Sequence, residues 1–222
     1  MSASVASAHP LRPIWAIVVA GGSGERFGAP KQFEPLGGMR VLDWAVAAAR
    51  EACDGVVLVL PAELVDGSRS AADAVVAGAE SRSGSVRAGL GAVPPDAAMV
   101  LVHDAARPLA SAALFAAVIA AVDAGADAAL PGVPVADTLR RRDGDRANVD
   151  RAELVAVQTP QAFRADVLRS AHEGGPEATD DASLVDERGG HVVVVPGEAR
   201  NRKITEPDDL VVARALLEAG RR

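Results

Sequence analysis

A short apolar segment that runs directly into a glycine-rich turn is the feature that most constrains this chain. Residues 14–20 read Ile-Trp-Ala-Ile-Val-Val-Ala, and Gly21-Gly22-Ser23-Gly24 follows at once. About seven apolar residues bounded by glycine predict a buried strand rather than a cleaved signal segment. Because glycine has no Cβ, the turn lets backbone N–H groups approach an anion, so this segment predicts a phosphate-binding loop.

Apolar runs alternate with helix-like stretches along the rest of the chain. The predicted strands are residues 14–19, 55–60, 74–77, 99–103, 127–130 and 191–195. The predicted helices are residues 41–52, 85–92, 110–124, 164–172, 181–188 and 207–219, several of them opened by a capping Ser, Asp or Thr. This alternation predicts one α/β domain over residues 1–222, with a mostly parallel, twisted sheet covered by helices on both faces. Ligands of such sheets bind beyond the carboxyl ends of the strands.

Residues 134–158 interrupt this alternation. The polar run Arg140-Arg141-Arg142-Asp143-Gly144-Asp145-Arg146 lies between two β-prone segments, 133–139 and 154–158. Asp-Gly is typical of a hairpin turn, so we predict a protruding β-arm. The arm is either a solvated loop or an extension that reaches a second subunit, and the residues alone leave both open. We expect residues 1–13 to form a disordered tail.

The charge balance limits the partners that this chain can have. A net charge of −7 argues against nucleic-acid binding, which normally needs a basic face. No apolar run approaches the ~20 residues that span a bilayer, so we expect a soluble protein without membrane contact. The single cysteine, Cys53, excludes an intramolecular disulfide and fits a reducing, cytoplasmic location.

The basic residues are therefore expected to act locally. Lys31 and Lys203 are the only lysines among the 23 basic residues. A lysine is a compact, mobile charge where arginine is a planar fork, so both lysines are candidates for chemistry, although chance explains their rarity equally well. Arg26 and Lys31 add two cations to the glycine-rich turn, an arrangement that suits a triphosphate.

Two common phosphate-binding motifs do not fit this turn. The dinucleotide fingerprint G-x-G-x-x-G needs a glycine where Phe27 stands, and the P-loop needs a Gly-Lys-Ser/Thr sequence that does not follow. Leu60-Pro61-Ala62 also stands where a ribose-binding acid would be expected. A nicotinamide-binding oxidoreductase is therefore disfavoured.

Further motifs follow one another along the chain. They are Gly21-Gly22-Ser23-Gly24-Glu25-Arg26 with Pro30-Lys31-Gln32, Val102-His103-Asp104-Ala105-Ala106-Arg107-Pro108, Asp137-Thr138, Asp150-Arg151, Thr159-Pro160-Gln161, Thr179-Asp180-Asp181-Ala182-Ser183 and Asn201-Arg202-Lys203-Ile204-Thr205. In this order they resemble the 2-C-methyl-D-erythritol 4-phosphate cytidylyltransferase family of sugar-phosphate nucleotidyltransferases. The resemblance implies a Rossmann-like nucleotidyltransferase fold. It also implies transfer of CMP from CTP to methylerythritol phosphate, with release of pyrophosphate.

The resemblance implies roles for individual residues as well. Those expected to be catalytic are Arg26, Lys31, Arg151 and Lys203. Those expected to bind the sugar-alcohol phosphate are Asp104, Arg107, Thr138 and Thr159. Those expected to bind the nucleotide are Ala20, Gly21, Gly22, Ser23, Gly24, Ala79 and Ser85. Asp104 follows a predicted strand, where it could bind hydroxyls, help to hold a metal, or cap a helix.

The expected cofactor is Mg²⁺, carried with the CTP triphosphate, and its protein ligands are left open. By the same resemblance the chain forms a homodimer, in which the arm brings Thr138, Arg151 and Thr159 to the partner's site. A ribitol 5-phosphate cytidylyltransferase remains an alternative, because it shares the loop, the lysine and the Thr-Pro-Gln motif. From a different class, a non-catalytic nucleotide-sensing module remains, although it predicts losses among charged positions that are all present here.

Overall fold

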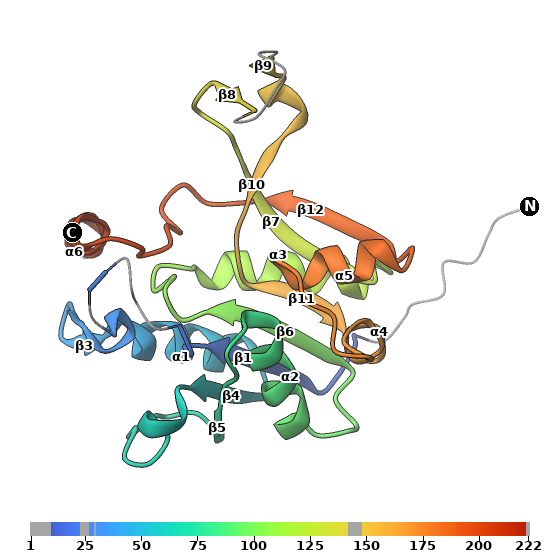
Figure 1. Ribbon diagram of the computed structural model, residues 1–222, viewed down its shortest axis with the longest axis horizontal. Helices are drawn as coiled ribbons and strands as arrows, with labels where there is room; N and C mark the ends of the chain where they lie inside the picture. Colours follow the sequence, from blue (N-terminus) through green and yellow to red (C-terminus); the bar gives the residue numbers. More distant parts are fainter. Residues whose placement is uncertain (1–9, 23–26, 29, 142–147, 221–222) are drawn as a thin grey trace, which may run out of the picture.

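The computed structural model describes residues 10–22, 27–28, 30–141 and 148–220. An eight-stranded sheet forms the centre of this part of the chain (Figure 1). Its strands are β1 (Ile14–Val19), β4 (Gly55–Leu60), β5 (Ala74–Ala77), β6 (Met99–Asp104), β7 (Ala128–Pro134), β10 (Val155–Val157), β11 (Gln161–Arg164) and β12 (Val192–Pro196).

The strands run in the order β5-β4-β1-β6-β11-β7, and β10 and β12 also pair with β7. Strands β5, β4, β1 and β6 are parallel, as are β7 and β12. β11 is antiparallel to both of its neighbours, and β10 is antiparallel to β7. The predicted mostly parallel sheet is confirmed. The sequence pattern does not predict β11, because Gln-Ala-Phe-Arg has weak strand propensity and its pairing depends on two distant strands.

Helices cover both faces of the sheet, as predicted. The helices that do so are α1 (Val41–Ala52), α2 (Arg82–Ala92), α3 (Ala112–Asp123), α4 (Ala165–Ala171) and α5 (Asp181–Glu187), while α6 (Pro207–Ala219) packs elsewhere. Ile14, Ala16 and Val18 of β1 belong to the apolar cluster that contains residues of α1 and α3. Ile17 belongs to the cluster on the other face, with residues of α2, α4 and α5. Side chains of one strand thus alternate between two cores, as expected for a strand buried on both faces.

Helix α2 begins at Arg82 rather than at the predicted residue 85. Ser81 is its N-cap, because the Ser81 hydroxyl accepts a hydrogen bond from the backbone N–H of Gly84 at 2.9 Å. The first turn contains serine and glycine, whose low helix propensity hides it from the sequence pattern. This correction makes Arg82 a helix residue rather than a loop residue.

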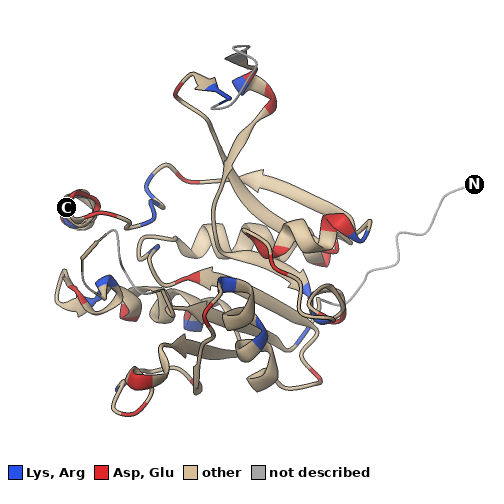
Figure 2. Ribbon diagram, viewed as in Figure 1, with Lys and Arg blue, Asp and Glu red and all other residues tan. Residues whose placement is uncertain are grey.

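A β-arm leaves the sheet between β7 and β10 (Figure 1). Two short strands, β8 (Leu139–Arg140) and β9 (Asn148–Val149), pair antiparallel on it, and the 3-10 helix η3 (Arg151–Glu153) follows. Figure 2 shows basic residues on this arm and on the loop that leads to α6. The predicted arm is present in residues 134–141 and 148–158, the predicted Asp-Gly turn at 143–144 lies outside the described residues, and the role of the arm in a dimer stays a prediction.

The C-terminal helix α6 packs on a part of the fold outside the central sheet (Figure 1). This helix packs on a third apolar cluster that contains Leu36, Leu109 and Ile204. Leu36 lies in a small hairpin of β2 (Pro35–Leu36) and β3 (Met39–Arg40), which follows the 3-10 helix η1 (Lys31–Phe33). Ile204 is almost fully buried, so it anchors the loop that carries the adjacent Lys203.

Of the predicted tail over residues 1–13, the structure describes only residues 10–13. Residues 1–9 lie outside the described residues. The backbone N–H of Leu11 donates to Asp123 at 2.8 Å, and the carbonyl of Pro13 accepts from Ala98 at 2.9 Å, so residues 10–13 contact the fold. Among the described helices, none combines the length and the apolar character needed to cross a membrane.

Candidate active site

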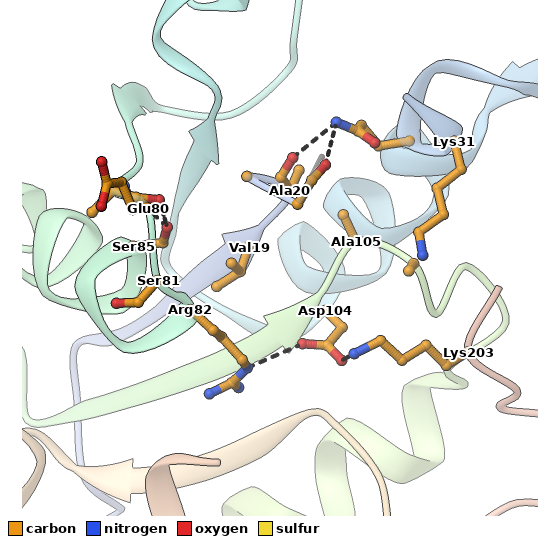
Figure 3. A pocket seen from close by; sticks show the side chains of 15 residues that line it. Val19, Ala20, Lys31, Glu80, Ser81, Arg82, Ser85, Asp104, Ala105 and Lys203 are labelled. Carbon is orange, nitrogen blue, oxygen red and sulfur yellow. Dashed lines mark hydrogen bonds and ion pairs between the residues drawn. The ribbon is translucent and has the colours of Figure 1, made fainter. Parts of the chain in front are cut away.

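A pocket of about 360 Å³ lies beyond the carboxyl ends of β1, β5 and β6. In the sheet, β4 pairs with one side of β1 and β6 with the other, so the order of the strands reverses direction at β1. Open α/β sheets bind their ligands in the crevice at such a reversal of strand order. The pocket is lined by Val19, Ala20, Gly21, Gly22, Lys31, Gln32, Ala79, Glu80, Ser81, Arg82, Ser85, Asp104, Ala105, Ala106 and Lys203 (Figure 3).

The turn after β1 forms the first wall of the pocket. The backbone N–H of Ala20 donates to the carbonyl of Val59 at 2.8 Å. The buried side chain of Gln32 donates from Nε2 to the carbonyl of Ala20 at 3.1 Å. These bonds hold the start of the turn, so that Gly21 and Gly22 present backbone to the pocket.

Lys31 comes from η1, which follows this turn. Figure 3 shows its side chain extending into the pocket from the side opposite Ser81 and Ser85. The predicted residues Ser23, Gly24 and Arg26 lie outside the described residues, and their roles stay predictions.

The loop between β5 and α2 forms the second wall. Ser85 Oγ accepts a hydrogen bond from the N–H of Ala79 at 3.1 Å and donates to the carbonyl of Ala79 at 3.2 Å. A Cβ on Gly78 or Gly21 would lie 2.8 or 3.3 Å from this hydroxyl oxygen, so Ser85 fills the narrow space between the two walls. The predicted nucleotide-binding residues that meet at the pocket are Ala20, Gly21, Gly22, Ala79 and Ser85.

Asp104, at the end of β6, faces three cationic side chains. Its Oδ2 lies 2.8 Å from Nζ of Lys203, and its Oδ1 lies 3.7 Å from Nε of Arg82 (Figure 3). Oδ2 also lies 3.8 Å from Nε of Arg107. Burial raises the pKa of Asp104, but the charge of Lys203, followed by those of Arg82 and Arg107, outweighs burial and holds this pKa well below its ordinary value. Asp104 is therefore a carboxylate at neutral pH.

Arg82 is a pocket residue that sequence reasoning missed. It lies in the first turn of α2, and its Nη1 donates to Oδ2 of the fully buried Asp181 at 2.8 Å. Burial lowers the pKa of Arg82, while Asp181 and Asp104 raise it, with a net rise. An arginine three residues before Ser85, in a loop predicted to contact the nucleotide, is the sequence signal that could have identified it.

Thr159 and His103 hold the backbone of Asp104 in place through hydrogen bonds. The hydroxyl of Thr159 accepts a hydrogen bond from the backbone N–H of Asp104 at 3.0 Å and bonds Nδ1 of His103 at 3.1 Å. Burial lowers the pKa of His103 to about 4, partly offset by the charge of Asp104, so this histidine is neutral at pH 7. We predict from the resemblance that Thr159 binds the acceptor in a partner's site, but here its hydroxyl fixes the end of β6 in its own chain.

Arg107 connects three segments around the pocket. Its Nη1 donates to the carbonyl of Asn201 at 2.9 Å and its Nη2 to the carbonyl of Val157 at 3.4 Å. Burial lowers the pKa of Arg107, and the charge of Asp104 opposes this shift. Arg107 thus ties the loop that bears Lys203 and the base of the arm to β6.

Thr138 and Arg151 lie away from this pocket. They line a separate hollow of about 430 Å³ on the arm, together with Val149 and Asp150. Arg151 donates from Nη1 to the carbonyl of Ala136 at 2.5 Å. A single chain therefore does not bring these two predicted residues to Asp104 and Lys203.

Comparison with known proteins decides the family. The family model described as 2-C-methyl-D-erythritol 4-phosphate cytidylyltransferase matches residues 14–219. The chain is 47% identical over 219 residues to the protein of that name from Rhodococcus opacus, covering 94% of this chain and 96% of the relative. The chain belongs to the 2-C-methyl-D-erythritol 4-phosphate cytidylyltransferase family. The resemblance of its motifs to this family is thereby confirmed, and a ribitol 5-phosphate enzyme is not favoured.

Other relatives agree with this assignment. The 2-C-methyl-D-erythritol 4-phosphate cytidylyltransferase of Rubrobacter xylanophilus is 43% identical over 221 residues, which cover 93% of this chain and 96% of the relative. The crystal structure of the protein of that name from Thermus thermophilus is 38% identical, with a TM-score of 0.77 over 91% of this chain and 98% of that one. As a member of this cytidylyltransferase family, the chain is a nucleotidyltransferase, as predicted.

Proposed function

We propose that the pocket beyond β1, β5 and β6 transfers CMP from CTP to 2-C-methyl-D-erythritol 4-phosphate, giving 4-diphosphocytidyl-2-C-methyl-D-erythritol and pyrophosphate in the non-mevalonate route to isoprenoid precursors. One observation supports this site above all. Lys31 and Lys203, the only two lysines of the chain, line the same pocket together with Asp104. Distant parts of the chain therefore bring positive charge to one place, as a reaction between a triphosphate and a phosphate requires.

The two walls of the pocket suit the nucleotide. Backbone at Ala20, Gly21 and Ala79 lines a space narrowed by Ser85, and no tyrosine occurs in the chain. We assign base recognition to this backbone, since a narrow slot favours a pyrimidine over a purine by size. The triphosphate would extend along the glycine-rich turn toward Lys31, and Arg26 would act there with it.

The opposite part of the pocket suits the acceptor phosphate. Lys203 offers an ammonium group, and Asp104 offers carboxylate oxygens for hydroxyl groups. A phosphate monoester loses its second proton near pH 6, so its attacking oxygen is already ionised at neutral pH and needs no general base. The neutral, buried His103 agrees with this expectation because it is bound to Thr159 and Arg107 rather than aimed at the pocket.

The chemistry is one displacement at phosphorus. An oxygen of the acceptor phosphate forms a bond to the α-phosphorus of CTP, and the bond between that phosphorus and the β-phosphate oxygen breaks. Pyrophosphate leaves with the electron pair. Lys31, Lys203 and Arg26 would stabilise the charge that builds up on the phosphoryl and leaving-group oxygens.

A divalent cation, which we propose to be Mg²⁺, would enter with the triphosphate. Mg²⁺ prefers oxygen ligands and is usually held by one or two carboxylates together with substrate phosphates. Among the described residues, Glu80 and Asp104 are the acidic residues that line the pocket. Asp104 already faces three cations, so the exposed Glu80 is the better protein ligand of the two. Within the described residues, no group of three His, Cys, Asp or Glu side chains could hold a metal ion without the nucleotide. When bound, the ion would neutralise triphosphate charge.

We propose further that the arm completes the site of a second subunit in a homodimer. Thr138 and Arg151 lie on the arm and away from the pocket of their own chain. Family resemblance assigns both residues to the acceptor phosphate, and an exchange of arms across a symmetric dimer would bring them to it.

We propose a cytoplasmic location. The single cysteine, Cys53, is free and partly buried, and burial raises its pKa to about 12, which fits a reducing compartment.

Pyrophosphate release tests the proposed function. Purified protein is incubated with CTP and Mg²⁺ and with methylerythritol phosphate or ribitol 5-phosphate in separate reactions. We expect release with methylerythritol phosphate alone. Release with ribitol 5-phosphate alone would show that the protein uses this acceptor in place of methylerythritol phosphate. No release with either acceptor would favour a nucleotide-sensing module.

A further inference from the structure

Asp181 links the pocket to a buried histidine. It is the first residue of α5 and is fully buried. Its Oδ2 accepts a hydrogen bond from Arg82 at 2.8 Å, and its Oδ1 lies 3.0 Å from Nε2 of His172, which follows α4. The neighbouring Asp180 caps α5 by accepting from the N–H of Ser183 at 2.9 Å. Asp181 is therefore not needed as the cap, and its carboxylate serves Arg82 and His172.

The position of Arg82 decides how Asp104 is used. Arg82 lies between two carboxylates, in direct hydrogen-bond contact with Asp181 but 3.7 Å from Oδ1 of Asp104. The other oxygen of Asp104, Oδ2, contacts Lys203 at 2.8 Å. Asp181 thus keeps Arg82 close enough to favour ionised Asp104, yet short of a direct bond that would occupy Oδ1.

Asp181 supplies the nearer of the two counter-charges to Arg82. A largely buried guanidinium that loses one carboxylate partner is strongly destabilised unless it finds another. Among the acidic residues that act on Arg82, Asp180 is engaged in capping α5 and Asp104 lies at the pocket. Without Asp181, Arg82 would move the short distance to Asp104 and cover its Oδ1.

We propose that Asp181, held in place by His172, is a positioning residue that keeps Arg82 back from Asp104 and so leaves Oδ1 of Asp104 available to a hydroxyl group of the acceptor. This role rests on the proposed function of the pocket. It places Asp181 outside the group of residues that touch substrate. Its effect on the reaction is carried entirely by Arg82.

The test is a double-mutant cycle on pyrophosphate release. Asp181→Asn keeps the size of the side chain and removes its charge. We expect the KM for methylerythritol phosphate to rise about tenfold with kcat little changed, the size expected for side chains coupled in one charged network. Adding Arg82→Gln to Asp181→Asn removes the guanidinium that covers Asp104, so the KM of the double variant should fall back to that of Arg82→Gln alone.

A purely structural role for Asp181 gives a different result. In that case the double variant would have a KM at least as high as that of Asp181→Asn, and the positioning role would be wrong. Asp73→Asn is the matched control. In the wild type, Oδ2 of Asp73 also accepts a hydrogen bond from an arginine, Arg50, at 2.9 Å, but this pair lies at the amino end of β5. Asp73→Asn should therefore lower the stability of the protein and leave the KM for the acceptor at the wild-type value.

His172→Ala keeps the test decisive if Asp181→Asn does not fold. It leaves the charge of Asp181 and removes one of its two partners, so we expect a smaller rise in acceptor KM, about threefold, again reversed by Arg82→Gln. An unchanged KM in folded His172→Ala, or a raised KM that Arg82→Gln does not reverse, would overturn the proposal. Wild-type protein that releases no pyrophosphate with either acceptor would instead refute the proposed function, and the positioning role with it.

Discussion

Nζ of Lys203 lies 2.8 Å from Oδ2 of Asp104. The two residues come from the loop before α6 and from the carboxyl end of β6. The side chain of Asp104 is only 11% exposed, whereas that of Lys203 is 41% exposed, so the lysine can also reach a ligand in the pocket. This ion pair sets a fixed negative charge beside a movable positive one at the place where we expect the acceptor phosphate.

Removing the charge of Lys203 should abolish most of the activity. Lys203→Met keeps the apolar stem and deletes the ammonium group, so we expect kcat/KM to fall by about 100-fold, as for the loss of one preorganised charge-stabilising donor. Arg202→Met is the control, because Arg202 is exposed and pairs with Asp209 at 3.4 Å. Steady-state pyrophosphate release measures both. Equal losses in the two variants would contradict a specific role for Lys203.

The stability of the fold should depend on pH through His103. Burial lowers its native pKa to about 4, while the unfolded chain has the ordinary value of about 6.5. As the pH falls through this interval, the unfolded state takes up a proton before the native state, so stability is complete above pH 6.5 and is lost toward pH 4. Between pH 7 and pH 5 we expect a loss of about 2 kcal/mol in the free energy of unfolding from this group.

Urea unfolding at pH 7 and pH 5 checks this dependence. His103→Asn should be less stable than the wild type at pH 7, because it gives up the hydrogen bonds to Thr159 and Arg107 and the ring contact with Phe115. Its stability should change less between the two pH values, since asparagine does not titrate. The same pH dependence in both proteins would show that other groups cause it.

Helix α2 offers a matched pair of glycines. A Cβ on Gly89 would lie 2.5 Å from Ile17 and 3.1 Å from Val59, whereas a Cβ on Gly91 would meet no atom within 4 Å. Gly89→Ala should therefore force α2 away from the sheet and destabilise the protein by about 1–3 kcal/mol. Gly91→Ala should stabilise it by about 0.5–1 kcal/mol through helix propensity. Thermal melting of the two variants distinguishes these effects, and a gain for Gly89→Ala would contradict the close packing.

The sequence predicts those parts of the molecule that local pattern determines. Strand β1 with its glycine turn is readable because a buried strand and a glycine turn each have a local signature. The contact of Arg82 with Asp181 joins residues 99 positions apart, and no periodicity within either segment reveals it. β11 is missed for the same reason, since its two neighbours rather than its own residues make it a strand. The resemblance of the motifs identified Thr138 and Arg151 as site residues. No pattern in the sequence shows whether they act in the pocket of their own chain or in that of a partner subunit.

Subunit complementation tests whether the arm serves the partner's pocket. Lys31 lines the pocket, and Arg151 lies on the arm. We expect Lys31→Ala and Arg151→Ala each to be nearly inactive as homodimers. In a heterodimer with exchanged arms, the pocket with an intact Lys31 receives an intact Arg151 from the other chain. Equal mixing should restore about a quarter of the wild-type rate, because about half of randomly reassorted dimers are mixed and each carries one intact site.

The comparison needs verified heterodimers, which two different affinity tags and sequential purification provide. A mixture of Lys31→Ala and Lys203→Met is the control, since both residues line the pocket of the same chain and every mixed dimer then lacks an intact site. Recovery with the first pair but not the second would place Arg151 in the partner's site. If verified heterodimers of Lys31→Ala and Arg151→Ala stay inactive, the arm does not act across the dimer, and Arg151 must reach the pocket of its own chain.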